Sequence, residues 1–147
     1  MGIRVRNLYY LFAGVLAVLF AITHVWNGQS TVLPALQMSS IAMDTRIVFM
    51  YVWHMITAEN LVFGIVFIFM SLQREQSKIR SAAWTIVLLL LVRLMVILGI
   101  TAYQDASALM DTLIDSIAIV IYVVIILLGI KTKKEKFREL PQSNTVK

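Results

Sequence analysis

The sequence predicts an all-α integral membrane protein with four transmembrane helices in an antiparallel bundle and both termini in the cytoplasm. Three observations support this. Hydrophobic residues make up 60% of the 147 residues, and the mean hydropathy is +0.84, whereas soluble proteins are about 45–50% apolar. Four apolar runs each approach or exceed the roughly 20 residues that a membrane-spanning helix needs. The basic residues gather at the ends of these runs rather than inside them.

The first predicted span covers residues 8–26 and follows Arg4 and Arg6. The apolar run continues to Trp26 without a small-residue cleavage signal, so we expect an uncleaved span rather than a signal peptide. The following segment, residues 27–45, is the longest connection and is predicted as an outer loop. Within it, Pro34 suits the first turn of a short helix, and Asp44 is a candidate N-cap for the second span.

The second span, residues 46–72, is long enough to cross the membrane with some tilt. A basic link leads to the third span, residues 82–103. The connection after Gln104 is short, which makes the third span and the fourth, residues 108–130, antiparallel neighbours. Residues 1–130 therefore form the transmembrane domain, and residues 131–147 are predicted to be a basic, disordered tail.

The distribution of basic residues predicts the orientation. Two lie before the first span, three in the link between the second and third spans, and six in the tail, which is eleven of the thirteen in the chain. By the positive-inside rule these three segments face the cytoplasm. We expect a multi-pass protein of a cell membrane, the plasma membrane of a bacterium.

The same charge pattern indicates the partners. The net charge of +5 comes from residues at span ends and in the tail, which favours contact with membrane lipids rather than with nucleic acid. The basic tail is expected to lie against anionic headgroups. Four spans also suit a homo-oligomer or a complex with another membrane subunit. The chain has no cysteine, which excludes disulfides, thiolate catalysis and cysteine metal ligands.

Polar side chains within the spans are the candidate site, because such residues are expensive at bilayer depth. Glu59 lies thirteen residues from Leu72, and Arg93 lies eleven from Ala82. A rise of about 1.5 Å per residue places both roughly 16–20 Å from the cytoplasmic side. We therefore predict a buried ion pair between Glu59 and Arg93, within a polar network that includes Thr57 and Asn60.

A second group is predicted in the outer half of the bundle, at roughly 22–28 Å, and consists of His24, His54, Asp111 and Asp115. Helix-dipole stabilisation at a helix start explains Asp111 well and the deeper Asp115 less well. Each histidine alone is more often a hydrogen-bonded bundle residue than a ligand. If Glu59, Asp111 and Asp115 are ionised, Arg93 balances only one of the three negative charges. The excess could be neutralised by a divalent metal on two histidines and one or two carboxylates, by protonation of the carboxyl groups, or by protonation of both histidines.

Three functions follow from this predicted polar pocket. The first is a ligand-binding or accessory membrane subunit, which the sequence favours. The second is a membrane-embedded oxidoreductase that uses a metal or haem, although acids beside His24 and His54 disfavour an apolar haem pocket. The third is a proton-coupled carrier of a small solute, in which Asp115 or Glu59 would titrate. No catalytic residue is assigned.

Overall fold

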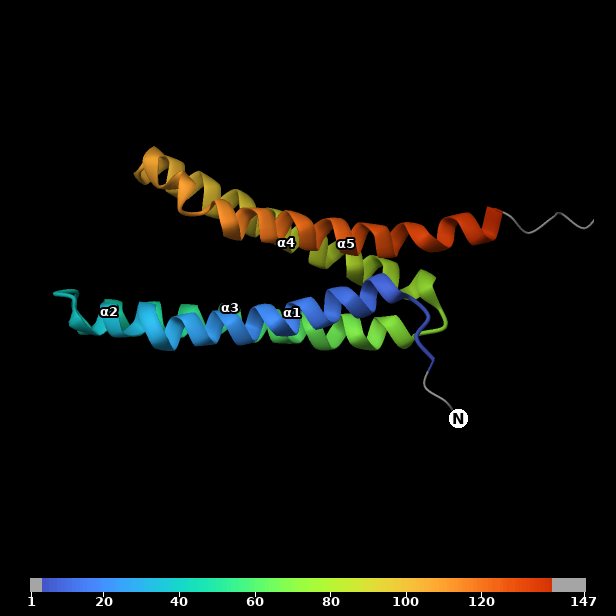
Figure 1. Ribbon diagram of the computed structural model, residues 1–147, viewed down its shortest axis with the longest axis horizontal. Coiled ribbons are helices and arrows are strands. Elements are labelled where there is room, and N and C mark those ends of the chain that lie inside the picture. Colours follow the sequence, from blue (N-terminus) through green and yellow to red (C-terminus); the bar gives the residue numbers. More distant parts are fainter. Residues whose placement is uncertain (1–3, 139–147) are drawn as a thin grey trace, which may run out of the picture. The chain divides into compact units, whose positions relative to one another are not determined.

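The computed structural model describes residues 4–138, in which every regular element is helical (Figure 1). The all-α prediction is confirmed. The elements are α1 (Leu8–Asn27), the π-helical turn η1 (Gly28–Val32), α2 (Leu33–Met38), α3 (Met43–Leu72), α4 (Gln76–Gln104), the 3-10 helix η2 (Ala106–Met110) and α5 (Leu113–Arg138).

Four helical segments are long and apolar enough to cross a membrane, which confirms the predicted number of apolar spans. They are Leu8–Met38, Met43–Leu72, Ser77–Gln104 and Leu113–Lys131. Only 17–28% of the most apolar window of each segment is buried within the chain. So much exposed apolar surface indicates that the chain is a multi-pass membrane protein, because lipid can cover what the chain does not.

Two boundaries differ from those expected from the sequence. The first helix does not end near Trp26 but continues through η1 and α2 to Met38, with Pro34 in the first turn of α2. A proline is accepted there because its missing N–H costs little at a helix start. The last helix begins at Leu113 instead of Ala108, and it extends to Arg138, into the segment expected to be disordered. The rest of that segment lies outside the described residues.

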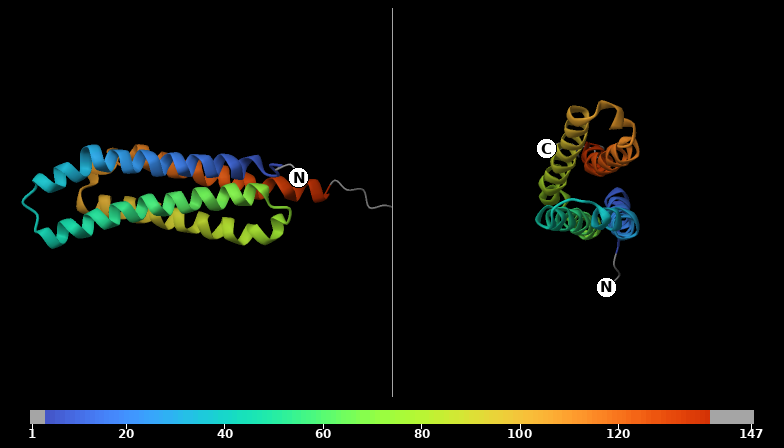
Figure 2. Two further views of the ribbon diagram at one scale, coloured as in Figure 1. Left: turned by 90° about the horizontal axis from the view of Figure 1, so that it is seen from below. Right: turned by 90° about the vertical axis from the view of Figure 1, so that its left-hand side faces the viewer.

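The chain forms two compact units, of which the first, Leu11–Phe69, is here called the hairpin unit. In it α1 and α3 lie side by side and antiparallel (Figure 1, Figure 2). Gly14 and Gly64 allow this approach: a Cβ on Gly14 would lie 2.9 Å from the carbonyl oxygen of Gly64. Small residues at such a crossing bring helix backbones together. The buried apolar residues of this unit include Ala13, Ala17, Ala21, Phe63 and Phe67.

The connection between α2 and α3 is held by Arg46. Its Nη2 donates to the carbonyl oxygens of Ser39 and Ile41, each at 3.1 Å. The backbone N–H of Ser39 donates to the carbonyl oxygen of Leu36, which closes the end of α2. Asp44, expected as an N-cap, lies instead within the first turn of α3, where the helix dipole favours a negative charge.

The second unit combines Met1–Tyr10 with Met70–Lys147 and is here called the terminal unit. In its described part, α4 and α5 run antiparallel and contact each other (Figure 1). Its buried apolar residues include Tyr10, Met70, Ala83, Val87, Leu90, Tyr122 and Ile126. Because these residues come from the start of α1, the end of α3, α4 and α5, the unit is built from segments far apart in the sequence.

Candidate functional site

The best-defined side-chain pair of the hairpin unit joins His24 of α1 to Trp53 of α3. The two ring centroids are 4.2 Å apart, with an angle of 31° between the ring planes. The Trp53 indole N–H also donates to the carbonyl oxygen of His24, at 3.2 Å. Trp53 therefore holds both the backbone and the side chain of His24. In the sequence, His24 follows Ala13, Ala17 and Ala21 at helical spacing, but nothing there reveals its aromatic partner.

Gly28 makes room for this pair. A Cβ on Gly28 would lie 2.8 Å from Cδ1 of Trp53 and would collide with its Nε1. The glycine is buried and begins the π-helical turn η1. Short π-helical turns occur often at functional sites, because they rotate the following residues relative to an α-helix. Here the turn lies directly after the histidine-bearing end of α1.

His54 is exposed, unlike its half-buried neighbour Trp53. One residue along a helix is a rotation of about 100°, so the two side chains leave α3 in different directions. His54 shares its side of α3 with apolar residues at alternating spacings of four and three. Of these, four with large, exposed side chains are Ile47, Tyr51, Leu61 and Ile65. His54 is therefore an ionisable residue within an apolar, exposed stripe of a candidate membrane span.

The residues of the predicted polar network on α3, namely Thr57, Glu59 and Asn60, differ in how far they are buried. Asn60 is buried and Glu59 is half-buried, and both take part in interactions within the chain. The Thr57 hydroxyl donates to the carbonyl oxygen of Trp53 at 3.4 Å, a long bond to its own helix. Such a bond gives the Thr57 hydroxyl a hydrogen-bond acceptor on its own helix within an apolar span.

The three polar candidates of the terminal unit lie at different places along it. Arg93 is half-buried in the middle of α4 and takes part in an interaction. Asp111 is exposed between η2 and α5, and Asp115 is exposed in the first turn of α5. Because α5 begins at Leu113, the helix dipole favours a carboxylate at Asp115 as well as at Asp111. The expectation that the helix dipole explains Asp115 less well assumed a helix that begins at Ala108.

The predicted metal ligands are divided between the two units, with His24 and His54 in the hairpin unit and Asp111 and Asp115 in the terminal unit. Among the side chains that the structure describes, no group of three or more histidine, aspartate or glutamate residues is arranged to hold a metal ion. The pocket and its metal therefore stay predictions.

The terminal unit contains a polar junction that the sequence analysis missed, centred on Asn7. Its side chain is buried, and its amide Nδ2 donates to the carbonyl oxygen of Gly129 in α5, at 2.9 Å. Its Oδ1 accepts the backbone N–H of Tyr10, at 3.2 Å, and its own backbone N–H donates to the carbonyl oxygen of Ser71, also at 3.2 Å. One residue thus ties together the start of α1, the end of α3 and α5.

The sequence indicates the two residues of this junction separately, but not the bond that joins them. An asparagine directly before an apolar helical run is a strong N-cap candidate, and Gly129 is the glycine nearest the end of the fourth apolar run. A Cβ on Gly129 would lie 2.6 Å from Cε1 of Tyr10, so only glycine admits the Tyr10 ring. The bond between Asn7 and Gly129 spans 122 positions, and nothing local in the sequence predicts it.

Comparison of the chain with protein-family models, with curated proteins and with solved structures finds no match.

Proposed function

We propose that the chain is a polytopic membrane protein that acts as a ligand-binding or accessory subunit. It would bind its ligand or partner through the His54 face, defined as the side of α3 with Ile47, Tyr51, His54, Leu61 and Ile65. The observation that carries the proposal is the exposure of His54 within a candidate span. An imidazole that faces hydrocarbon loses its hydrogen bonds with water, so a polar group from a partner or ligand stabilises it.

The pattern around His54 favours a helical partner. Apolar residues at alternating spacings of four and three form the seam along which two helices pack with a small crossing angle. A single polar residue in such a seam fixes the register between the two helices. The Trp53–His24 pair supports this role, because it anchors α3 to α1 beside the proposed contact.

Site-specific photo-crosslinking in native membranes tests the proposal. A photoreactive amino acid at position 54 should give an adduct with another protein or with a small molecule. The matched control is Met55, which is exposed at nearly the same depth but points about 100° away around the helix. Position 55 should give adducts with lipid. Lipid adducts alone at position 54, or an adduct only with another part of the same chain, would contradict the proposal.

A further inference from the structure

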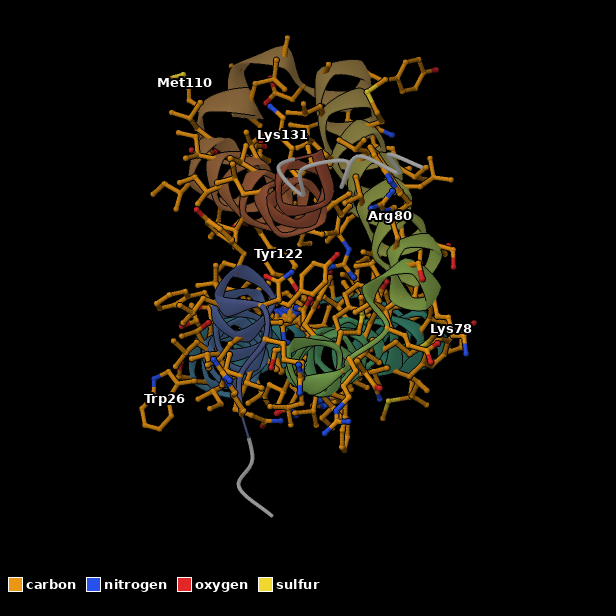
Figure 3. The ribbon with its side chains drawn as sticks, turned by 90° about the vertical axis from the view of Figure 1, so that its right-hand side faces the viewer. Trp26, Lys78, Arg80, Met110, Tyr122 and Lys131 are labelled. Carbon is orange, nitrogen blue, oxygen red and sulfur yellow. The ribbon has the colours of Figure 1, made fainter. Side chains whose placement is uncertain are left out.

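The described basic side chains of the terminal unit, apart from Arg93 within α4, gather at one end of it. This group, here called the basic end, consists of Arg4, Arg6, Arg74, Lys78, Arg80 and Lys131. All six side chains are exposed. Figure 3 looks onto this end and labels Lys78 and Arg80 on α4 and Lys131 on α5. The six residues come from three separate stretches of chain.

The basic end lies where the apolar spans stop. Arg6 is two residues before α1, Arg74 is two residues after α3, and Lys131 ends the last candidate span. Lys78 and Arg80 belong to the first two turns of α4. A membrane places its lipid phosphate groups at this level, directly beyond the hydrocarbon. Guanidinium and ammonium groups here are therefore within reach of lipid headgroups.

The described ionisable side chains of the basic end are mostly basic. Among its described side chains the acidic residue is Glu75, which is paired with Lys78 at 2.5 Å. Arg74 has an interaction of its own within the chain, and Arg4, Arg6, Arg80 and Lys131 add four exposed positive charges. Arg80, in α4, also interacts electrostatically with Tyr10 in the first turn of α1. Charge complementarity therefore favours an anionic occupant.

The Asn7 junction holds these charges in place. The backbone N–H of Arg6 donates to the carbonyl oxygen of Ser71, at 2.8 Å, beside the bond from Asn7. The Asn7 amide reaches Gly129, two residues before Lys131. Arg6 and the end of α3 are thus joined by main-chain bonds, and the Asn7 side chain links them to the end of the α5 span. A site whose charged groups are already positioned loses less entropy when it binds.

We propose that the basic end binds the phosphate headgroup of an anionic phospholipid, with Arg6, Arg80 and Lys131 around the Asn7 junction as the core of the site. Arginine suits this role because its planar guanidinium can donate two hydrogen bonds to one phosphate. The proposal is independent of the His54 face, which belongs to the hairpin unit.

Tryptophan quenching by brominated lipids tests this proposal with the full-length chain in nanodiscs. Trp84 is one turn along α4 from Arg80 and is exposed, so it reports lipid at the basic end. Trp26, which projects outward from the far end of α1 (Figure 3), is the matched control. Each is made the single tryptophan by replacing the other two with phenylalanine. Brominated phosphatidylglycerol is compared with brominated phosphatidylcholine.

We expect phosphatidylglycerol to be preferred at Trp84 by about fivefold or more, since each basic residue near an anionic surface contributes about 1 kcal/mol. No preference is expected at Trp26. Arg6→Gln combined with Arg80→Gln should bring the preference at Trp84 close to one, whereas Arg46→Gln, far along the chain from this end, should leave it unchanged. Equal quenching by the two lipids at Trp84, or a preference that survives the double substitution, would overturn the proposal.

A salt titration of the unsubstituted basic end covers the case in which the double variant does not fold. Raising the ionic strength from about 0.1 M to about 1 M shortens the screening length from roughly 10 Å to 3 Å. The preference for phosphatidylglycerol at Trp84 should then fall towards one. A preference that stays constant over this range would show that charge does not select the lipid.

Discussion

Asn7 combines two side-chain roles that few other residues could supply at its position. Its Oδ1 caps α1, its Nδ2 binds the carbonyl oxygen of Gly129, and its backbone binds Ser71. Serine could cap the helix but is too short to carry the amide donor. Aspartate could cap it too, but it has no donor for Gly129 and would place a charge in a buried position.

We expect Asn7→Ala to lower the free energy of unfolding by about 1–3 kcal/mol, because it removes a helix cap and leaves a buried carbonyl with one partner fewer. Asn7→Ser should cost less than Asn7→Ala, since it restores only the cap. Unfolding in detergent, followed by circular dichroism, measures both. Equal stability of the alanine variant and the wild type would show that the junction contributes nothing.

Asp105, in the connection between α4 and η2, illustrates a local effect at an exposed residue. Its carboxylate accepts the Ser107 hydroxyl at 2.6 Å and the Ser107 N–H at 2.9 Å. These bonds lower the pKa of Asp105 below its usual value, and the hydroxyl contributes most. A lowered pKa in the folded state means that this contribution to stability is present above the unfolded-state pKa of about 3.9 and is lost as the pH falls through the folded-state pKa.

Ser107→Ala should therefore raise the pKa of Asp105 towards its usual value, while the bond from the backbone N–H persists. The carboxyl carbon shift of Asp105, followed by NMR over an acid titration, reports the change. Thr112, whose hydroxyl donates to the carbonyl oxygen of Leu109, provides the control: Thr112→Ala should leave the titration of Asp105 where it is. A titration unchanged by Ser107→Ala would contradict the assignment.

At the scale of elements, the contact between α1 and α3 depends on two glycines that face each other. A Cβ on Gly64 would lie 2.6 Å from Cγ2 of Val18 and 3.0 Å from the carbonyl oxygen of Gly14. The Val18 side chain can rotate, but the backbone of α1 cannot yield without the helices moving apart. Close packing of this pair therefore requires glycine at both positions.

Gly64→Ala should destabilise the protein by about 1–3 kcal/mol, the usual cost of overpacking a close contact. Gly99→Ala is the matched control, since a Cβ there meets nothing within 4 Å. It should stabilise α4 by about 0.5–1 kcal/mol, because alanine loses less backbone entropy than glycine in a helix. Thermal unfolding of both variants in the same detergent measures the contrast. A similar loss in both would mean that the helix crossing does not need its glycines.

The sequence predicts the elements much better than it predicts their contacts. Hydropathy locates four apolar helices because each run of about 20 apolar residues has few structural alternatives. It does not predict the continuation of the first helix to Met38, since the polar residues from Asn27 to Thr31 resemble a loop. The Trp53–His24 pair and the bond from Asn7 to Gly129 join distant positions, and periodicity within one helix contains no information about either.

At the scale of the whole molecule, the orientation in the membrane is a prediction from the basic residues. Reporter fusions after Gln76 and after Lys147 should both be active as cytoplasmic fusions. A fusion after Ser39 should behave as external, because the segment around it has few basic residues. An external result at Gln76 would overturn the assignment of sides and, with it, the depths derived for the polar residues.

The predicted coupling of Glu59 with Arg93 also belongs to this scale, since the two residues lie in different units. If they pair, Glu59→Gln and Arg93→Met should each cost about 3–5 kcal/mol, because each leaves one charge buried alone. The double variant should lose less than the sum of the single variants. Additive losses in this double-mutant cycle would show that the two residues do not interact.

The continuous first helix raises the question of bilayer thickness. Leu8–Met38 has 31 residues and is about 46 Å long, whereas the hydrocarbon layer is about 30 Å thick. The segment from Asn27 to Thr31 begins nineteen residues after Leu8, which is about 29 Å along the helix. With Leu8 at one hydrophobic boundary and the helix upright, the π-helical turn would lie at the other boundary. A membrane only a few ångströms thicker would submerge Gln29, Ser30 and Thr31 or force the helix to change its tilt. Either response to this hydrophobic mismatch would make Gly28 and the adjacent Trp53–His24 pair sensitive to lipid chain length.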